Sequence, residues 1–395
     1  LDGTQLWRID MGYNIRAGQH DTQLNVADFD GDGRAEVMVR TADGTVDGQG
    51  NVIGDASKGE TYESSWAALN GGKNLQGPLY VTCFDGETGK ALDTIDYFPN
   101  NTVGSNAASL TFGDDFGNRS ERYNSTIAYI DGQSPSAVFA RGYYFGKGIS
   151  NPNGRTGAAA YSFKNGKLKM EWSFDTAESK NNGYIGQGNH QIEAGDVDGD
   201  GQYDLFVKWF PTNQADNSHR RYTGKTLIDC YRLDGTKLWR IDLGQNIRSG
   251  NHYTQFMVYD FDGDGKAELI CKTAPGTIDG QGKAVLMGSD KVDDDYRTKS
   301  GDNAGIVISG PEYLTVFNGL TGAEINTIAY NPPRSIQSTG SWGDSYGNRS
   351  ERYLAGVAYL DGQKPSAVFC RGYYTHSYLW AVDFDGRQLK ERWLH

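Results

Sequence analysis

The stretch "ADFDGDGRAEVMVRT", residues 27–41, places three aspartates at alternate positions, with two glycines among them and a glutamate before an apolar run. The same pattern returns as "GDVDGDGQYDLFVKW" from Gly195 and as "YDFDGDGKAELICKT" from Tyr259. Glycine permits the positive φ angles that a tightly curled loop needs. Each stretch therefore predicts a curled acidic loop that leads directly into a β-strand.

The acidic loops predict calcium sites, because hard oxygen ligands at this density suit Ca²⁺ better than zinc or copper. An EF-hand needs its bidentate acid at the twelfth position, which is Val39 when counted from Asp28, whereas these loops place an acid at the ninth. The alternative is an Asx-turn held by its own hydrogen bonds, in which four carboxylates would repel one another. We expect a structural role for the metal, since these turns need their charge cancelled in order to fold. The predicted ligands are Asp28, Asp30, Asp32, Glu36, Asp196, Asp198, Asp200, Asp204, Asp260, Asp262, Asp264 and Glu268.

The composition indicates an all-β protein built from short strands and tight turns. Among 395 residues there are 53 glycines and only 10 prolines, aromatic residues make up 12%, and no long apolar stripe has the helical period. The formal net charge of -12 argues against nucleic acid as a partner, because nucleic-acid binding needs clustered lysine and arginine. No apolar run is long enough to cross a bilayer, so we expect no membrane partner. The four cysteines (Cys83, Cys230, Cys271 and Cys370) lie in strand-like runs without metal-ligand spacing, which predicts buried free thiols.

The chain consists of two similar halves. "LDGTQLWRIDMGYNIRAGQH" at Leu1 matches "LDGTKLWRIDLGQNIRSGNH" at Leu233, and "FGDDFGNRSERY" at Phe112 matches "WGDSYGNRSERY" at Trp342, a period of about 230 residues. We therefore predict a first half-propeller repeat over residues 1–190 and a second over residues 191–395, within one propeller-like domain.

Each half contains a smaller recurrence of two hairpins. The first hairpin turns around Asp28, Asp131, Asp196, Asp260 and Asp361, and the second around Asp85, Asn165, Asp234, Asn318 and Asp385, with an extra copy at Asp2. Two hairpins make a four-stranded antiparallel sheet, and such a sheet repeated radially is a propeller blade. The sequence predicts a β-propeller of five full blades and one half-blade, with the long segments Thr45–Gly77 and Thr277–Gly310 as loops on one face. Stacked β-sandwiches with the same turns are the alternative.

Longer motifs carry a family resemblance. "GQGNHQIEAGDVDGDGQYDLFVKWFPTNQADNS", "SGPEYLTVF" and "WGDSYGNRSERYLAGVAYLDGQKPSAVFCRGYY" resemble the rhamnogalacturonan lyases of polysaccharide lyase family 11, almost continuously from about Gly186 to His395. Residues 1–190 resemble part of the same region again. The resemblance implies a secreted, calcium-bearing propeller of eight blades that cuts the rhamnose–galacturonate backbone of pectic rhamnogalacturonan I by β-elimination. This localisation rests on the resemblance alone, because the chain shows no signal-peptide pattern.

The sequence departs from the family's organisation. The family places a β-sandwich before the propeller and further blades after the "RGYY" blade, and a duplicated front half stands here in place of the back half. Three interpretations remain open: a lyase, a non-catalytic structural or carbohydrate-binding propeller that assembles end to end through its unfinished terminal blades, or an incomplete or composite chain.

Four groups of residues are candidates for contact with an acidic polysaccharide. His190 matches a histidine position of the family and Lys208 offers a cation, so both are predicted catalytic residues, although a histidine that caps a turn is an equal alternative. Trp209 and Asn213 in "KWFPTN" offer a stacking ring and an amide, while Trp209 also suits a protein core. Arg141, Tyr143, Arg371 and Tyr373 of the two "RGYY" motifs are predicted to form a uronate-binding rim. Arg16 and Arg248, with His20 and His252 four residues on, recur in both halves, which favours a shared structural role, such as pairing with the acidic loops, over a catalytic one.

Overall fold

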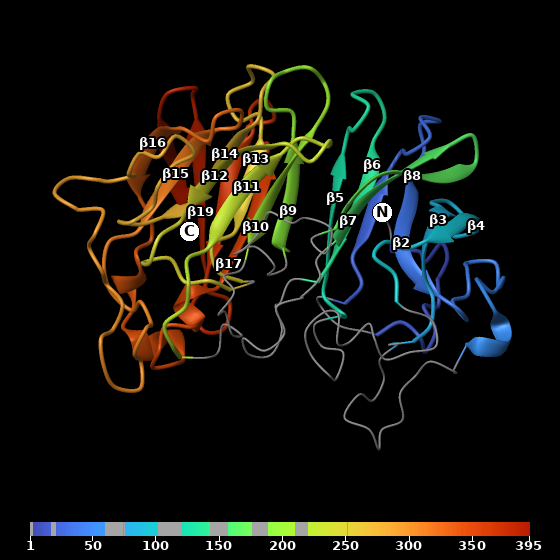
Figure 1. The fold of residues 1–395 in the computed structure, drawn as a ribbon, viewed down its shortest axis with the longest axis horizontal. Coiled ribbons are helices and arrows are strands. Elements are labelled where there is room, and N and C mark those ends of the chain that lie inside the picture. Colours follow the sequence, from blue (N-terminus) through green and yellow to red (C-terminus); the bar gives the residue numbers. More distant parts are fainter. Residues whose placement is uncertain are drawn as a thin grey trace. The chain divides into compact units, whose positions relative to one another are not determined.

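The computed structural model describes residues 3–16, 21–59, 74, 76–101, 120–142, 157–175, 189–209, 220–250 and 252–395. These residues form five four-stranded antiparallel sheets, in which each strand pairs with its neighbour in sequence (Figure 1). The sheets confirm the prediction of an all-β fold. None of the helices in the described residues is long and apolar enough to span a membrane.

The chain divides into two compact units, Leu1–Ile192 and Glu193–His395. The first unit holds β1 (Leu24–Ala27), β2 (Glu36–Ala42), β3 (Leu79–Asp85), β4 (Ala91–Asp96), β5 (Tyr123–Ala128), β6 (Ser136–Arg141), β7 (Gly157–Lys164) and β8 (Lys167–Asp175), with the 3-10 turn η1 (Ala56–Lys58). A third sheet begins with β9 (Asn189–Gly195), in which the division falls, and continues with β10 (Asp204–Trp209), β11 (Leu227–Tyr231) and β12 (Lys237–Asp242). The second unit adds β13 (Phe256–Tyr259), β14 (Glu268–Thr273), β15 (Tyr313–Asn318), β16 (Glu324–Ala329), β17 (Tyr353–Ala358), β18 (Ser366–Arg371), β19 (Tyr378–Phe384) and β20 (Leu389–Leu394). Its 3-10 turns are η2 (Arg334–Ile336), η3 (Thr339–Trp342) and η4 (Arg349–Glu351).

The predicted turns fall between strands, except the extra copy at Asp2, which lies outside the described residues. Each acidic or "Y-x-D-G-Q" turn joins the first and second strands of a sheet, and each second hairpin joins the third and fourth. Glycines in the acidic loops have φ angles between 81° and 89° at Gly31, Gly33, Gly199, Gly201, Gly263 and Gly265. The positions of the hairpins are thus confirmed, because glycine and aspartate fix these turns locally.

The inner strands of each sheet supply the core. All six residues of β10 and of β14 are buried, whereas the fourth strands β4 and β16 are only partly buried. Threonine hydroxyls also join neighbouring strands side by side, from Thr273 to Thr315 at 2.7 Å and from Thr315 to Thr327 at 3.0 Å. The four cysteines are free and buried, as predicted.

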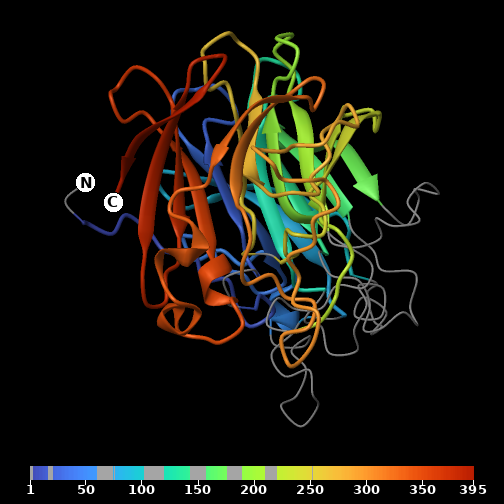
Figure 2. The same cartoon turned by 90° about the vertical axis from the view of Figure 1, so that its left-hand side faces the viewer.

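Within each unit, neighbouring sheets approach each other at equivalent strands. In the second unit β13 lies against β17 and β16 against β20, and in the first unit β1 lies against β5 and β4 against β8. Figure 2 shows the sheets β13–β16 and β17–β20 side by side. Because strands alternate in direction, the acidic loops lie at one end of the sheets. The longer connections 274–312, 330–352 and 372–377 leave from the opposite end, which we call the open-loop end of the second unit.

Candidate functional site

The acidic loops bring their carboxylates together. The sets whose ligand atoms all lie within 4.8 Å of one another are Asp28, Asp30 and Asp32, then Asp196, Asp198 and Asp200, and then Asp260, Asp262 and Glu268. Glu36, Asp204 and Asp264, which the sequence predicts as ligands, are not members of these sets. Three carboxylates close together at each turn form the geometric core of a cation site.

Backbone hydrogen bonds hold each loop in its curled form. In the third loop Asp260 accepts from the backbone N–H of Gly263 at 2.8 Å and of Gly265 at 3.0 Å. Glu268 uses one oxygen to accept from Phe261 N at 3.0 Å. The Asx-turn and the carboxylate cluster therefore occur in the same loop, since each carboxylate oxygen can accept more than one bond.

The charges in these loops are poorly compensated by protein groups. Burial and then the three aspartates of its loop raise the pKa of the Glu268 carboxyl to about 8, although a backbone N–H opposes this shift. Burial and the neighbouring aspartates likewise raise the pKa of the Asp204 carboxyl to about 6, against the influence of Arg232. Burial is the largest cause of both pKa shifts and the neighbouring aspartates add to it, so protein groups do not fully compensate these carboxylates. The donor set and its unmet charge fit a bound divalent cation with oxygen ligands, such as Ca²⁺.

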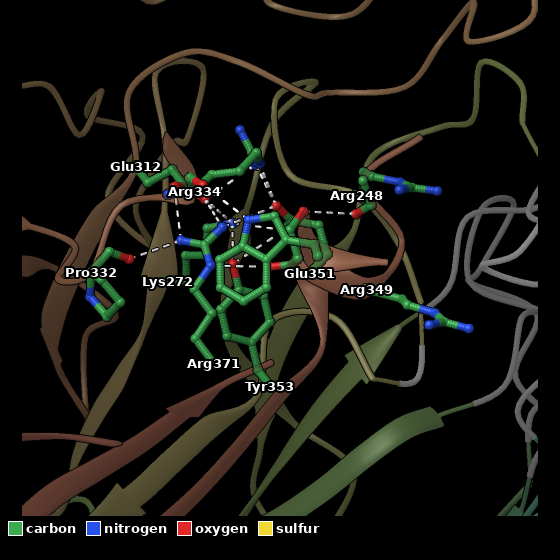
Figure 3. A network of polar contacts seen from close by, with 12 residues as sticks. Arg248, Lys272, Glu312, Pro332, Arg334, Arg349, Glu351, Tyr353 and Arg371 are labelled. Atoms are coloured by element: carbon green, nitrogen blue, oxygen red, sulfur yellow. Dashed lines mark hydrogen bonds and ion pairs between the residues drawn. The ribbon is translucent and has the colours of Figure 1, made fainter. Parts of the chain in front are cut away.

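A second cluster of charges lies buried at the open-loop end of the second unit. Lys272, Arg334 and Arg371 surround Glu312 and Glu351, and these five side chains point toward one another (Figure 3). They come from β14, η2, β18, the residue before β15, and η4. We call this group the buried charge network.

The contacts within the buried charge network are short and numerous. Arg371 donates to both oxygens of Glu312, at 2.9 and 3.0 Å, and Lys272 Nζ lies 2.8 Å from each of the two carboxylates. Arg334 Nε donates to Glu351 at 2.8 Å. After burial, which opposes the shift, these cations hold the pKa of the Glu351 carboxyl at about 2 and that of Glu312 well below its usual range. Both acids are therefore ionised, and their oxygens are engaged in ion pairs within the network.

The first unit carries a reduced version of this network. Arg40, Glu121 and Arg141 take the sequence positions of Lys272, Glu351 and Arg371, whereas Leu79 and Asn101 replace Glu312 and Arg334. The closest Arg–Glu121 distances are 3.7 Å and 3.9 Å, and neither oxygen of Glu121 accepts a hydrogen bond from the described residues. The two halves thus share a charged core but differ in how fully it is paired.

Arginines and tyrosines cover the surface beside the buried charge network. The Arg349 guanidinium lies 4.8 Å from the ring centre of Tyr374, and that of Arg352 lies 5.6 Å from the same ring. Tyr373 stacks beside Tyr374 with ring centres 5.2 Å apart, and the two tyrosines are 37% and 52% exposed. We call Arg349, Tyr373 and Tyr374, together with the buried Arg352, the arginine–tyrosine surface.

The turn η4 connects the surface to the network. Arg349 and Arg352 flank Glu351, whose carboxylate points into the network while Arg349 points away from it (Figure 3). Asp344 fixes the same turn by accepting from the backbone N–H of Gly347 and Arg349. Arg349 forms no ion pair within the part of the chain that the structure describes. The arrangement presents a cation, backed by an aromatic ring, to solvent.

The structure places two of the predicted site residues in the interior. Lys208 is fully buried and its Nζ donates to the carbonyl oxygens of Tyr253 and Thr254, both at 2.9 Å. Burial lowers the pKa of the Lys208 ammonium to about 7. Trp209 is buried and packs edge-on against Tyr231, with ring centres 6.5 Å apart. Neither side chain reaches solvent in this structure. Trp209 thus occupies a core position, which was the alternative to a sugar-stacking role.

The predicted arginine rim is wrong, and the suggested pairing of Arg16 and Arg248 with the acidic loops is not seen. Arg141 and Arg371 do not form a binding rim, because both are at most 1% exposed and bond to core carbonyls and carboxylates. Only Tyr373 of the predicted rim is shown to be exposed. Arg16 pairs with Asp21 at 3.3 Å, and Arg248 lies 4.8 Å from the ring centre of Tyr253, so neither pairs with an acidic loop. Each precedes the first strand of a sheet in the sequence, Arg16 before β1 and Arg248 before β13.

Some predicted residues lie outside the described residues. These are His20, Tyr143 and Asn213, together with the side chain of His190, whose backbone belongs to β9. The catalytic role of His190 stays a prediction.

The arginine–tyrosine surface was missed by the motif reasoning, although its residues stand in quoted motifs. Arg349 and Arg352 occur in "GNRSERY", where two arginines three residues apart bracket a glutamate. The sequence signal for this surface was a group of three charged residues, Arg349, Glu351 and Arg352, directly before a strand. Which of its charges turns inward is decided by Lys272 and Arg334, which are distant in sequence.

The fold and site define a class of protein: an all-β chain of four-stranded antiparallel sheets with repeated clusters of carboxylates in its turns. The model of the rhamnogalacturonan lyase family 11 C-terminal domain matches this chain twice, over residues 1–200 and 191–395. The chain belongs to rhamnogalacturonan lyase family 11.

Two curated relatives from Bacillus subtilis (strain 168) are similar to about half of the chain. Rhamnogalacturonan exolyase YesX is 56% identical over 205 residues, which is 52% of this chain and 32% of the relative. Rhamnogalacturonan endolyase YesW is 56% identical over 204 residues, which is 52% of this chain and 31% of the relative. The matches thus span about a third of the length of these relatives. The crystal structure of the exotype lyase YesX matches 98% of this chain and 51% of that chain, with 31% identity and a TM-score of 0.48.

Proposed function

We propose that this chain is a calcium-dependent rhamnogalacturonan lyase that cleaves the rhamnose–galacturonate backbone of rhamnogalacturonan I by β-elimination. The observation that carries the proposal is the arginine–tyrosine surface, where Arg349 stacks on an exposed tyrosine without an ion pair to the described residues. Membership of the family and the names of the two relatives support the same substrate class. The proposal places the protein outside the cell, where pectic polysaccharide is found.

β-Elimination has requirements that this surface meets in part. The C5 proton of the uronate becomes acidic when a cation neutralises its carboxylate, a base then removes the proton, and the C4–O bond breaks as the C4–C5 double bond forms. Arg349, which is partly exposed, would bind the carboxylate, since guanidinium groups bind carboxylates in a bidentate way, whereas Arg352 is buried and would support the same tyrosine ring. The Tyr374 ring offers a stacking face for a sugar, and its hydroxyl is our candidate for proton transfer. His190 remains the second candidate base.

The acidic loops have a different task in the proposed function. In the second unit the loop at Asp260 lies at the end of the sheet opposite the arginine–tyrosine surface, since Glu268 begins β14 and Lys272 lies near its end. Bound Ca²⁺ would cancel the charge that crowds these turns, so its proposed role is to stabilise the fold. We further propose that the sheets are blades of a propeller, in keeping with first strands that lie beside first strands and fourth beside fourth.

The test of activity is an absorbance measurement. The purified chain is incubated with rhamnogalacturonan I and Ca²⁺, and the expected result is a steady rise in ultraviolet absorbance from the unsaturated uronate product. A chain that remains folded and binds the polysaccharide without any rise would contradict the lyase proposal. That outcome would favour the second candidate, a non-catalytic carbohydrate-binding protein.

Calcium binding is predicted to depend on the clustered aspartates. Replacing Asp260 by asparagine is expected to remove one equivalent of bound Ca²⁺ in isothermal titration, because Asp260 belongs to the third carboxylate set. It should also remove part of the thermal stabilisation that Ca²⁺ gives; one site at 100 times its Kd contributes about 2.7 kcal/mol.

The matched control for this prediction is Asp131→Asn. Asp131 forms the same kind of turn, accepting from the backbone N–H of Gln133 and Ser134, and belongs to no carboxylate set in the described residues. It should leave the Ca²⁺ stoichiometry unchanged. An equal loss in both variants, or no Ca²⁺ binding by the unmodified chain, would refute the metal assignment.

A further inference from the structure

Three arginines from separate segments of the second unit gather around one loop. Arg220 precedes β11 in the sequence, Arg248 precedes β13, and Arg349 begins η4. The Arg220 guanidinium lies 4.4 Å from the ring centre of Tyr346, and Nη1 of Arg248 donates to the carbonyl oxygen of the same tyrosine at 3.3 Å. Arg349 follows Tyr346 by three residues, so their Cα atoms are at most about 11 Å apart. We call Arg220, Arg248 and Arg349 the arginine group.

The loop that carries Tyr346 and Arg349 is fixed by its own backbone. The Asp344 carboxylate accepts from the backbone N–H groups of residues 346–349, at distances of 2.6–3.3 Å. Gly343 has a φ of 97°, and a Cβ there would lie 2.6 Å from Nη1 of Arg349, so only glycine fits at this position. The loop therefore holds Arg349 in place, while the carboxylate of Asp344 is engaged by the backbone.

Arg220 and Arg349 have no carboxylate partner in the described part of the chain. Neither forms an ion pair there, although the protein has a formal net charge of -12. Another arginine at the open-loop end, Arg297, is paired: its guanidinium lies 5.1 Å from the ring centre of Tyr222, and it donates twice to Asp295, both times at 2.9 Å. Cations gathered without opposite charges attract an anionic ligand.

The two halves of the chain differ at the residue beside Arg248. The counterpart of Arg248 in the first half is Arg16, which pairs with Asp21 at 3.3 Å. The counterpart of Asp21 is Tyr253, and the Arg248 guanidinium lies 4.8 Å from its ring centre. The second half thus has an aromatic ring where the first half has a neutralising carboxylate. Arg248 and Arg349 both extend away from the buried charge network, to the same side (Figure 3).

We propose that Arg220 and Arg248 form a second carboxylate subsite, which binds the next uronate of the polymer when one uronate lies at Arg349. The inference rests on the proposed function, in which Arg349 binds a uronate. In a backbone of alternating rhamnose and galacturonate, one neutral sugar separates two successive carboxylates. Guanidinium groups bind carboxylates in a bidentate way, and Tyr346 holds the Arg220 guanidinium by its ring. The arginine group would therefore recognise two uronates together.

The test compares two ligands that differ in the number of their carboxylates. One is a rhamnose–galacturonate disaccharide with a single carboxylate, and the other is the corresponding tetrasaccharide with two. Their Kd values are measured by isothermal titration at low temperature, and ultraviolet absorbance shows whether either ligand is cleaved. The unmodified protein should bind the tetrasaccharide more tightly. Arg220→Gln is expected to weaken tetrasaccharide binding by about tenfold, the loss of one charge-assisted contact, and to leave disaccharide binding unchanged.

Two further variants make this test specific. Arg248→Gln should weaken tetrasaccharide binding selectively, as Arg220→Gln does. The double variant should lose less than the sum of the two single effects, because both arginines would hold one carboxylate. Arg387→Gln is the control: it removes the same charge from an exposed arginine in the turn between β19 and β20 and should leave both affinities unchanged.

Three results would overturn the proposal. The first is an unmodified protein that binds both ligands equally. The second is an Arg220→Gln variant with unchanged affinity for the tetrasaccharide. The third is an equal loss for both ligands in Arg220→Gln, which would place Arg220 at the same subsite as Arg349.

Failure of the lyase activity has a different signature from failure of the second subsite. A chain that does not cleave the polymer, but loses tetrasaccharide binding selectively in Arg220→Gln, retains the second subsite. A chain that cleaves the polymer, with the same tetrasaccharide affinity in Arg220→Gln as in the unmodified protein, is a lyase without it. In an active chain that has the subsite, Arg220→Gln should raise KM on the polymer and leave kcat unchanged, because a remote contact contributes equally to substrate and transition state.

Discussion

Replacing Glu312 by leucine is expected to lower the free energy of unfolding of the second unit by about 3–5 kcal/mol, the cost of breaking a buried ion pair from one side. Glu312 is the partner of both Lys272 and Arg371 and accepts from the backbone of Arg334. The variant would leave three buried cations with Glu351 as their only carboxylate. Hydrogen exchange on peptides from residues 312–318 and 334–353, measured across a urea series, would report the loss in this unit.

The first unit suggests a second substitution that should restore part of the stability lost in this variant. There, Leu79 stands at the position of Glu312 and the neutral Asn101 at the position of Arg334. The first unit thus lacks one carboxylate and one cation together. The double variant Glu312→Leu with Arg334→Asn should therefore be more stable than Glu312→Leu alone. Glu87→Gln is the control, because its pair with Arg34 is largely exposed and such pairs contribute about 0–1 kcal/mol. A single variant as stable as the control would show that the network does not stabilise the fold.

The buried charge network also predicts how the stability of the second unit changes with pH. The pKa of Glu351 is depressed from 4.5 to about 2, so its contribution is fully present above about pH 4.5 and is lost as the pH falls toward 2. The unmodified second unit should lose stability over this range. In Glu312→Leu the loss should be smaller, because one of the two depressed carboxyl groups is absent.

Replacing Arg349 by alanine is expected to reduce kcat/KM on rhamnogalacturonan I by about 100- to 1,000-fold, the usual effect of removing one group that stabilises developing charge. The expectation follows from the position of its guanidinium over Tyr374, where it has no ion pair among the described residues and is available to a uronate. The measurement is the initial rate of the ultraviolet absorbance rise over a range of polysaccharide concentrations.

Two further variants make the Arg349 prediction specific. Arg349→Lys retains the charge but not the fork of donors, so it should recover only part of the rate. Arg387→Ala removes an exposed arginine from the hairpin turn between β19 and β20, at the end opposite the arginine–tyrosine surface, and should leave the rate unchanged. Equal rates for Arg349→Ala and Arg387→Ala, with both proteins folded, would assign the uronate site to other residues.

The local features of this chain could be predicted from sequence. The turns at Asp28, Asp196 and Asp260 follow from glycines that accept positive φ and from aspartates that cap their own backbone, and these are interactions within a few residues. The alternation of hairpins and apolar strands likewise predicts the four-stranded sheets. The burial of the cysteines follows from their position in strand-like runs of the sequence.

Whether each charged side chain is buried or exposed could not be predicted from such local interactions. Arg371 and Tyr373 stand in one motif, yet the arginine is buried against Glu312 while the tyrosine is exposed. Lys208 sits in a motif that suits a polysaccharide, but its ammonium is held in the core by two carbonyl groups. In each case the direction of the side chain depends on partners from other strands and turns.

The sequence by itself therefore determined the turns, the strands, the repeat of the halves and the acidic loops, because each is set by neighbouring residues. Only the tertiary structure decided that Lys272, Glu312, Arg334, Glu351 and Arg371 form one buried network. It also decided that Arg349 lies at the surface beside them (Figure 3). The physical reason is that a buried charge needs opposite charges within a few ångströms, and here folding brings them together from five separate segments of the chain.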